Sequence, residues 1–84
     1  MTDRVRKRLR RIHPKHQEQI TARIAALDDN PRPHDSIKLK SERYDFRIDV
    51  GEYRILYDVD YEARIIQVRL LMHRSEGYSR YLRL

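Results

Sequence analysis

Hydrophobic residues near the start of the chain recur with the period of an α-helix. Val5, Leu9 and Ile12 lie at positions i, i+4 and i+7, and this spacing predicts a helix over residues 3–12. The other positions of the segment are all charged, as expected for a helix with one buried face. Pro14 ends the helix, because proline disfavours helical backbone in the residue before it.

A second helical pattern follows over residues 15–28. Ile20, Ile24 and Leu27 form its apolar stripe, and the alanines between them favour helical backbone. Only a short break separates the two helices. We therefore expect them to form an antiparallel helical hairpin over residues 3–28.

Beyond Pro33 the hydrophobic period changes from that of a helix to that of a strand. Three runs of alternating apolar and polar residues, separated by short polar turns, predict an antiparallel meander, and a brief alternation before them indicates a further short strand. The predicted strands lie within residues 37–39, 44–48, 53–59 and 66–72.

The helical stripes find a partner only in the apolar face of this sheet. The sequence therefore predicts a single α+β domain over residues 1–84, with the helical hairpin on one face of a three- to four-stranded antiparallel sheet. The sheet extends over about residues 37–72, and a short C-terminal tail follows over residues 73–84.

Strict alternation also predicts the side chains on the sheet face opposite the helices. Arg47, Arg54 and Arg69 are expected there, and His73 has the same parity if the last strand extends that far. A solvated polar face and a contact surface for a partner both fit this pattern. The apolar residues expected on the same face are Leu56, Ile65 and Leu71, whereas Ile66, Val68, Leu70 and Met72 are expected to face the helices.

The charge of the chain favours the contact surface. Its 84 residues include 19 Lys and Arg against 13 Asp and Glu, a net charge of +6, and 15 of the basic residues are arginine. Guanidinium groups match the geometry of phosphate oxygens, so a polyanionic partner is expected. The same field attracts an acidic protein, and a basic surface also serves solubility alone.

Other classes of chemistry find no support in the sequence. Without cysteine there are no disulfides, thiolate metal ligands or cysteine nucleophiles. Pro14 breaks the helical pattern between His13 and His16, so these two histidines do not have the spacing of a metal site on one helix. We therefore expect no metal or other cofactor. No apolar run approaches the ~18 residues of a membrane span, so a cytoplasmic protein without a membrane partner is expected.

Two motifs in the second half of the chain carry a family resemblance. The first is RIDVGEYRILY at residues 47–57, and the second combines His73 and Arg74 with Tyr78. Together, behind a helical hairpin, they resemble the RelE/ParE superfamily of toxins from type II toxin–antitoxin systems, and the RelE branch best. The resemblance extends over about residues 2–81.

This resemblance implies an endoribonuclease that enters the ribosomal A site and cleaves mRNA there, with the 2′-hydroxyl of the RNA attacking the adjacent phosphate. By position, the cleavage step belongs to Arg54, Arg74 and Tyr78. Arg47 is expected to orient the RNA, and His73 to support proton transfer. The reaction implied by the resemblance requires no metal.

The same resemblance implies two macromolecular partners. Arg6, Arg10 and Arg11 on the first helix are candidates for contacts to ribosomal RNA, together with Arg69 on the sheet. A cognate antitoxin is implied as well. The net charge of +6 predicts that this antitoxin is acidic and forms a hetero-oligomer with the toxin.

Two features depart from the family pattern. Asp45 stands where some relatives carry a basic residue, which predicts lower activity. Relatives also begin with a β-strand, whereas Met1 lies almost at the first helix, so we expect either three main strands or an exposed sheet edge. A ParE-like gyrase inhibitor without chemistry of its own and a catalytically silent RNA-binding relative are the alternative functions.

Overall fold

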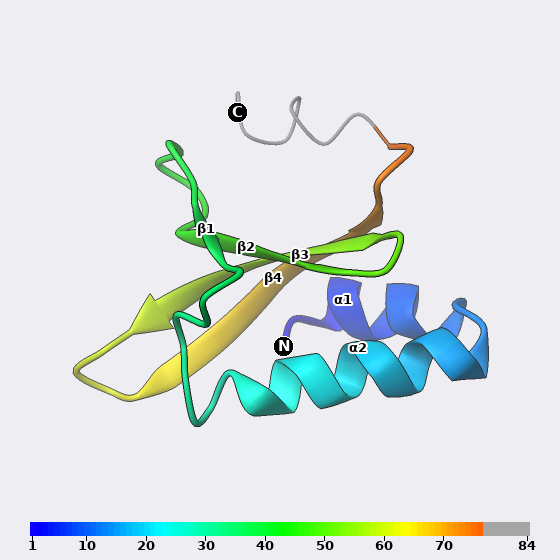
Figure 1. The fold of residues 1–84 in the computed structure, drawn as a ribbon, viewed down its shortest axis with the longest axis horizontal. Coiled ribbons are helices and arrows are strands. Elements are labelled where there is room, and N and C mark those ends of the chain that lie inside the picture. Colours follow the sequence, from blue (N-terminus) through cyan, green and yellow to red (C-terminus); the bar gives the residue numbers. More distant parts are fainter. Residues whose placement is uncertain (77–84) are drawn as a thin grey trace.

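The computed structural model describes residues 1–76, in which two helices are followed by a four-stranded antiparallel sheet (Figure 1). Both helices lie on one side of the sheet, which confirms the predicted α+β class. Neither described helix is long and apolar enough to cross a membrane. The elements are α1 (Asp3–Arg10), α2 (Pro14–Ala26), β1 (Ile37–Lys38), β2 (Phe46–Val50), β3 (Tyr53–Asp60) and β4 (Ile65–His73).

Local hydrogen bonds and one proline set the ends of the helices. Thr2 caps α1, because its hydroxyl oxygen accepts a hydrogen bond from the Val5 amide at 3.3 Å. α1 ends two residues earlier than expected, and the chain then tightens through a hydrogen bond from the Ile12 amide to the Leu9 carbonyl at 3.1 Å. Pro14 occupies the first turn of α2, where an amide N–H has no partner within the helix.

The four strands follow one another in the sheet in the order β1-β2-β3-β4. Gly51 has a φ of +57°, a left-handed conformation that glycine adopts without steric cost, and this allows the tight turn between β2 and β3. The turn sets the register of the hairpin. Val50 pairs with Tyr53, and Asp49 pairs with Arg54.

β4 contains a β-bulge at Arg69. Leu56 of β3 pairs with Leu70, but the next residue of β3, Tyr57, pairs with Val68. Arg69 is therefore one extra residue in β4, and such a residue shifts the alternation of the strand.

The bulge reverses the faces of the last residues of β4. Leu71 belongs to the core under the helices, whereas Leu70 and Met72 lie in a second cluster on the opposite face. His73 pairs with Tyr53, whose side chain packs against the helix-facing core. The expected faces of all four β4 residues from Leu70 to His73 are wrong, because strict alternation leaves out the extra residue.

The main core lies between the helices and the sheet, and a smaller one covers the open face. The hydroxyl of the buried Tyr57 donates a hydrogen bond to the Pro31 carbonyl at 2.8 Å, which ties the α2–β1 linker to the sheet. The buried side chains of the main core are Val5, Ile12, Ile20, Leu27, Phe46, Ile48, Ile55, Tyr57, Val68 and Leu71. Those of the open face are Tyr44, Leu56, Leu70 and Met72.

Ile20 gives the sharpest test of this packing, since its side chain is 0% exposed between α2 and the sheet. We expect Ile20→Ala to lower the free energy of unfolding by about 2–5 kcal/mol, through lost burial and the cavity that remains. Ile65→Ala is the matched control: Ile65 is 54% exposed, and a change within about 0.5 kcal/mol is expected. Equal losses in urea titrations of the two variants would contradict the described core.

Candidate functional site

The end of β4 meets the β2–β3 turn at Glu52. The Arg74 amide donates a hydrogen bond to the Glu52 carbonyl at 2.7 Å, which extends the β3–β4 pairing by one step. The Arg74 guanidinium forms an ion pair with the Glu52 carboxylate at 2.9 Å, and His73 Nε2 lies 3.8 Å from the same carboxylate. Glu52 thus gathers the His-Arg pair at one end of the sheet.

Arg54 lies beside this contact on β3. Its cross-strand neighbours are Asp49 on β2 and Met72 on β4. Since Arg74 comes two residues after Met72, it is the diagonal neighbour of Arg54, within reach of a long side chain. The register therefore places two of the predicted catalytic arginines at neighbouring positions of the sheet.

Arg47 lies on the same face of the sheet as Arg54, as the alternation predicts. It is opposite Leu56, a member of the open-face cluster. Its Nε lies 3.2 Å from an Asp49 carboxylate oxygen, and only 13% of its side chain is exposed. Because most of its side chain is buried, the Arg47 guanidinium is held in one direction.

Arg69 is on the open face as well, as the alternation predicts, since Val68 before it faces the helices. Its guanidinium binds the Asp58 carboxylate at 2.6 Å and lies over the Tyr44 ring, 5.7 Å from the ring centroid. A cation over an aromatic face is attracted by the ring quadrupole. Arg69 is thus held on β3 and on the open-face cluster, farther along the sheet than Arg54 and Arg74.

His73 does not share the open face with these arginines. Its ring lies edge-on to Tyr53 at 5.3 Å between centroids, and Tyr53 in turn lies 5.8 Å from His16 of α2. His73 Nδ1 is 2.8 Å from the Ser75 hydroxyl. The prediction that His73 joins Arg47 and Arg54 on one face is therefore wrong. Its side chain and that of Arg74 both approach the Glu52 carboxylate.

Glu76 closes the turn that follows β4. One of its carboxylate oxygens accepts a hydrogen bond from the His73 amide at 3.0 Å and also binds the guanidinium of Arg8 on α1. The His73 amide, supported by Arg8 and opposed by partial burial, holds the pKa of the Glu76 carboxyl below its usual value. Sequence reasoning missed this residue, because Arg8 and Glu76 are 68 positions apart.

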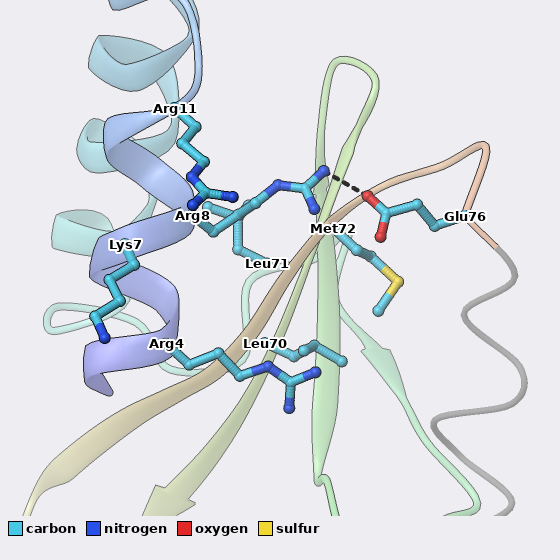
Figure 2. A pocket seen from close by; sticks show the side chains of 8 residues that line it. All are labelled: Arg4, Lys7, Arg8, Arg11, Leu70, Leu71, Met72 and Glu76. Atoms are coloured by element: carbon cyan, nitrogen blue, oxygen red, sulfur yellow. Dashed lines mark hydrogen bonds and ion pairs between the residues drawn. The ribbon is translucent and has the colours of Figure 1, made fainter.

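A groove of about 260 Å³ lies between α1 and β4, with the Arg8–Glu76 pair at one end (Figure 2). In Figure 2, Arg4 and Arg8 of α1 and Arg11, which directly follows the helix, project toward β4. The groove is lined by Arg4, Lys7, Arg8, Arg11, Leu70, Leu71, Met72 and Glu76.

The cations of α1 thus divide between the groove and the outer surface. Of the three α1 residues predicted to contact RNA, Arg11 lines the groove, whereas Arg6 forms an exposed ion pair with Asp3 at 3.0 Å. Arg10 is exposed and is not among the groove residues. The i, i+3, i+4, i+7 spacing of the groove cations was the signal that could have identified them.

Tyr78 lies outside the described residues. Asp45, which departs from the family pattern, has a role in the fold: its carboxylate accepts a hydrogen bond from the Val59 amide at 3.1 Å, and its own amide donates to Asp58 at 2.9 Å. These two bonds join the segment before β2 to the end of β3.

Comparison with known proteins identifies the family. Residues 1–78 match the family described as the ParE toxin of the type II toxin–antitoxin system parDE. The chain belongs to this toxin family. The toxin is also 30% identical over 79 residues to the protein named "Putative toxin RelE1" of Methanocaldococcus jannaschii, with 90% of this chain and 88% of the relative covered.

These findings confirm that the toxin is a member of the RelE/ParE superfamily. Membership in a type II system implies a cognate antitoxin as its partner. The family and the relative carry the names of different branches, ParE and RelE.

Asp45 provides a test of whether its departure from the family is catalytic or structural. We expect Asp45→Lys to lower the free energy of unfolding by about 1 kcal/mol or more, because the Val59 amide loses its acceptor. Asp45→Asn keeps an acceptor oxygen and is the matched control, with a smaller loss expected. Chemical denaturation measures both variants, and a Lys variant as stable as the native toxin would remove the structural role.

Proposed function

We propose that the toxin is a ribosome-dependent endoribonuclease that cleaves mRNA in the ribosomal A site and so inhibits translation. The observation that carries this proposal is the diagonal pair of Arg54 and Arg74 at the end of the sheet, with Arg47 on the same face as Arg54. Pre-positioned cations are what phosphodiester cleavage needs where charge develops in the transition state.

In the proposed reaction, the 2′-oxygen of the RNA forms a bond to the adjacent phosphorus, and the bond from phosphorus to the 5′-oxygen breaks. Arg54 and Arg74 offset the charge that grows on the phosphorane oxygens. Arg47, held by Asp49, orients the phosphate backbone. Tyr78 accepts or delivers a proton, which requires neighbouring cations because an unperturbed tyrosine has a pKa of about 10.

The position of His73 changes its part in this proposal. His73 packs on Tyr53 at the helix-facing side of the sheet, so its role in the proposal is to support the turn that carries Arg74. A proton transfer by His73 requires that the RNA extends around the sheet edge to this side. The name of the M. jannaschii relative supports the RelE-like activity, whereas the matched family supports a ParE-like gyrase inhibitor as the second candidate.

Single-turnover cleavage of mRNA on a programmed ribosomal complex tests the first candidate. We expect Arg54→Ala and Tyr78→Phe each to retain ribosome binding and to slow cleavage by at least about tenfold, which corresponds to ~1.4 kcal/mol of barrier. The physical reason is the loss of a positioned cation in the first variant and of the proton-transfer hydroxyl in the second.

Arg64→Asn is the matched control for charge. Arg64 lies in the β3–β4 turn with a φ of 57°, which asparagine tolerates, so the variant removes one cation without straining the fold. Cleavage at the native rate is expected. Full-speed cleavage by both Arg54→Ala and Tyr78→Phe would remove these residues from the mechanism, and gyrase-dependent DNA damage without any mRNA cleavage would support the second candidate.

The proposal extends to α1 as the surface that contacts ribosomal RNA, together with Arg69. We expect the triple variant Arg6→Gln, Arg10→Gln, Arg11→Gln to weaken ribosome binding while leaving the fold intact, because these exposed side chains are outside the core. The plot of log affinity against log salt falls with increasing salt, and each lost phosphate contact should make its negative slope shallower by about 0.7–0.9.

A triple variant around β1 distinguishes direct contacts of α1 with RNA from the effect of net charge. This control removes an equal number of positive charges from exposed positions through Lys38→Gln, Lys40→Gln and Arg43→Gln. Filter binding at several salt concentrations should show a larger loss for the α1 triple. Equal losses would mean that α1 contributes only to the overall field.

We further infer that the cognate antitoxin is acidic and covers part of this same basic surface. The groove between α1 and β4 combines four cations with three apolar side chains, a chemistry that suits an acidic amphipathic segment. Binding of such a segment would block the approach of RNA phosphates to the same cations.

A further inference from the structure

The turn after β4 is closed by the backbone amide and the side-chain carboxylate of Glu76. The Glu76 amide donates a hydrogen bond to the His73 carbonyl at 3.0 Å, while its carboxylate accepts one from the His73 amide at 3.0 Å. These reciprocal bonds close a ring around residues 73–76, and Arg74 lies inside that ring. The conformation of its backbone is therefore set by Glu76.

The same carboxylate anchors the turn to a distant part of the chain. It binds Arg8 of α1, and the two side chains are only 29% and 37% exposed, respectively. An ion pair that is partly shielded from water is screened less than one on the open surface. In Figure 2 the Arg8 side chain extends from α1 toward Glu76, so this contact fixes the turn relative to the helix.

We propose that Glu76 is a positioning residue for Arg74: it locks the turn 73–76 onto α1 and thereby holds the Arg74 guanidinium next to Arg54. Glu52 sets the direction of the Arg74 side chain through its ion pair, and Glu76 sets the backbone from which that side chain starts. This inference rests on the proposed cleavage activity, in which Arg74 contacts the phosphate. Glu76 itself does not touch the RNA.

Electrostatics alone predicts the opposite effect of removing this carboxylate. Glu76 lies in a groove with four cations, so its negative charge weakens the attraction of the groove for RNA phosphates. A variant without that charge should bind RNA more tightly and cleave at least as fast if the residue has no positioning role. The positioning role predicts slower cleavage despite equal or tighter binding. The two hypotheses therefore predict opposite changes in the cleavage rate.

The experiment measures ribosome affinity and single-turnover cleavage separately for Glu76→Ala and Glu76→Gln. For Glu76→Ala we expect a cleavage rate at least about tenfold lower, with ribosome affinity unchanged or higher. A loss of this size is expected when a cation is displaced from its position beside the reacting phosphate. Glu76→Gln keeps an acceptor for the His73 amide and should recover part of the rate. Glu62→Ala in the β3–β4 turn removes an exposed carboxylate elsewhere and should cleave at the native rate.

A double-mutant cycle shows whether Glu76 acts through Arg74. In the Arg74→Ala background, the further change Glu76→Ala should slow cleavage by less than about twofold, because the positioned group is already absent. Additive losses, or a Glu76→Ala variant that cleaves at the native rate, would overturn the proposal.

A spectroscopic measurement separates this proposal from the proposed function. The Arg74 Nε–H signal of the full-length toxin should be protected from solvent exchange by Glu52, and this protection should fall in Glu76→Ala while it persists in Glu62→Ala. Unchanged protection in Glu76→Ala overturns the positioning role whether or not the toxin cleaves mRNA. Lost protection in a toxin that does not cleave supports the positioning role and contradicts the proposed function instead.

Discussion

The bulge at Arg69 determines which side chains the end of the sheet presents. One extra residue in β4 moves Leu71 under the helices and brings Leu70 and Met72 to the open face, where they pack with Leu56 and Tyr44. The same shift directs His73 toward Tyr53. Without the bulge, strict alternation would place His73 next to the arginines of β2 and β3, and Leu71 would replace Leu70 and Met72 on the open face.

Carboxylates hold the cations of this small basic domain in place. Asp49 holds Arg47, Asp58 holds Arg69, Glu52 holds Arg74 and Glu76 holds Arg8. The first pair lies within β2, and the other three join segments that are distant in the sequence, so each partner fixes a direction as well as a charge. A surface that only repelled other copies of the chain would not need its arginines to be held in this way.

The helices and strands could be predicted because their apolar residues recur with a regular period. The bulge could not: residues 70–72 are Leu-Leu-Met, so a shift by one residue leaves an apolar side chain on each face and gives no sequence signal. Arg47 and Arg54 precede the bulge, and their common face follows from alternation alone. The Arg8–Glu76 pair joins residues 68 positions apart, a contact that only the packing of α1 on β4 creates.

The division of charge around Arg74 bears on the choice between an RNA-cleaving toxin and a gyrase inhibitor. Two carboxylates, Glu52 and Glu76, surround the His-Arg turn and reduce the positive field at the end of the sheet. Such an arrangement works against affinity for a polyanion, whereas it fixes the orientation of one guanidinium. Affinity suffices for a toxin that only binds its target, but a reaction gains rate from an oriented group. The held orientation of Arg74 therefore supports the proposed cleavage of RNA over gyrase inhibition.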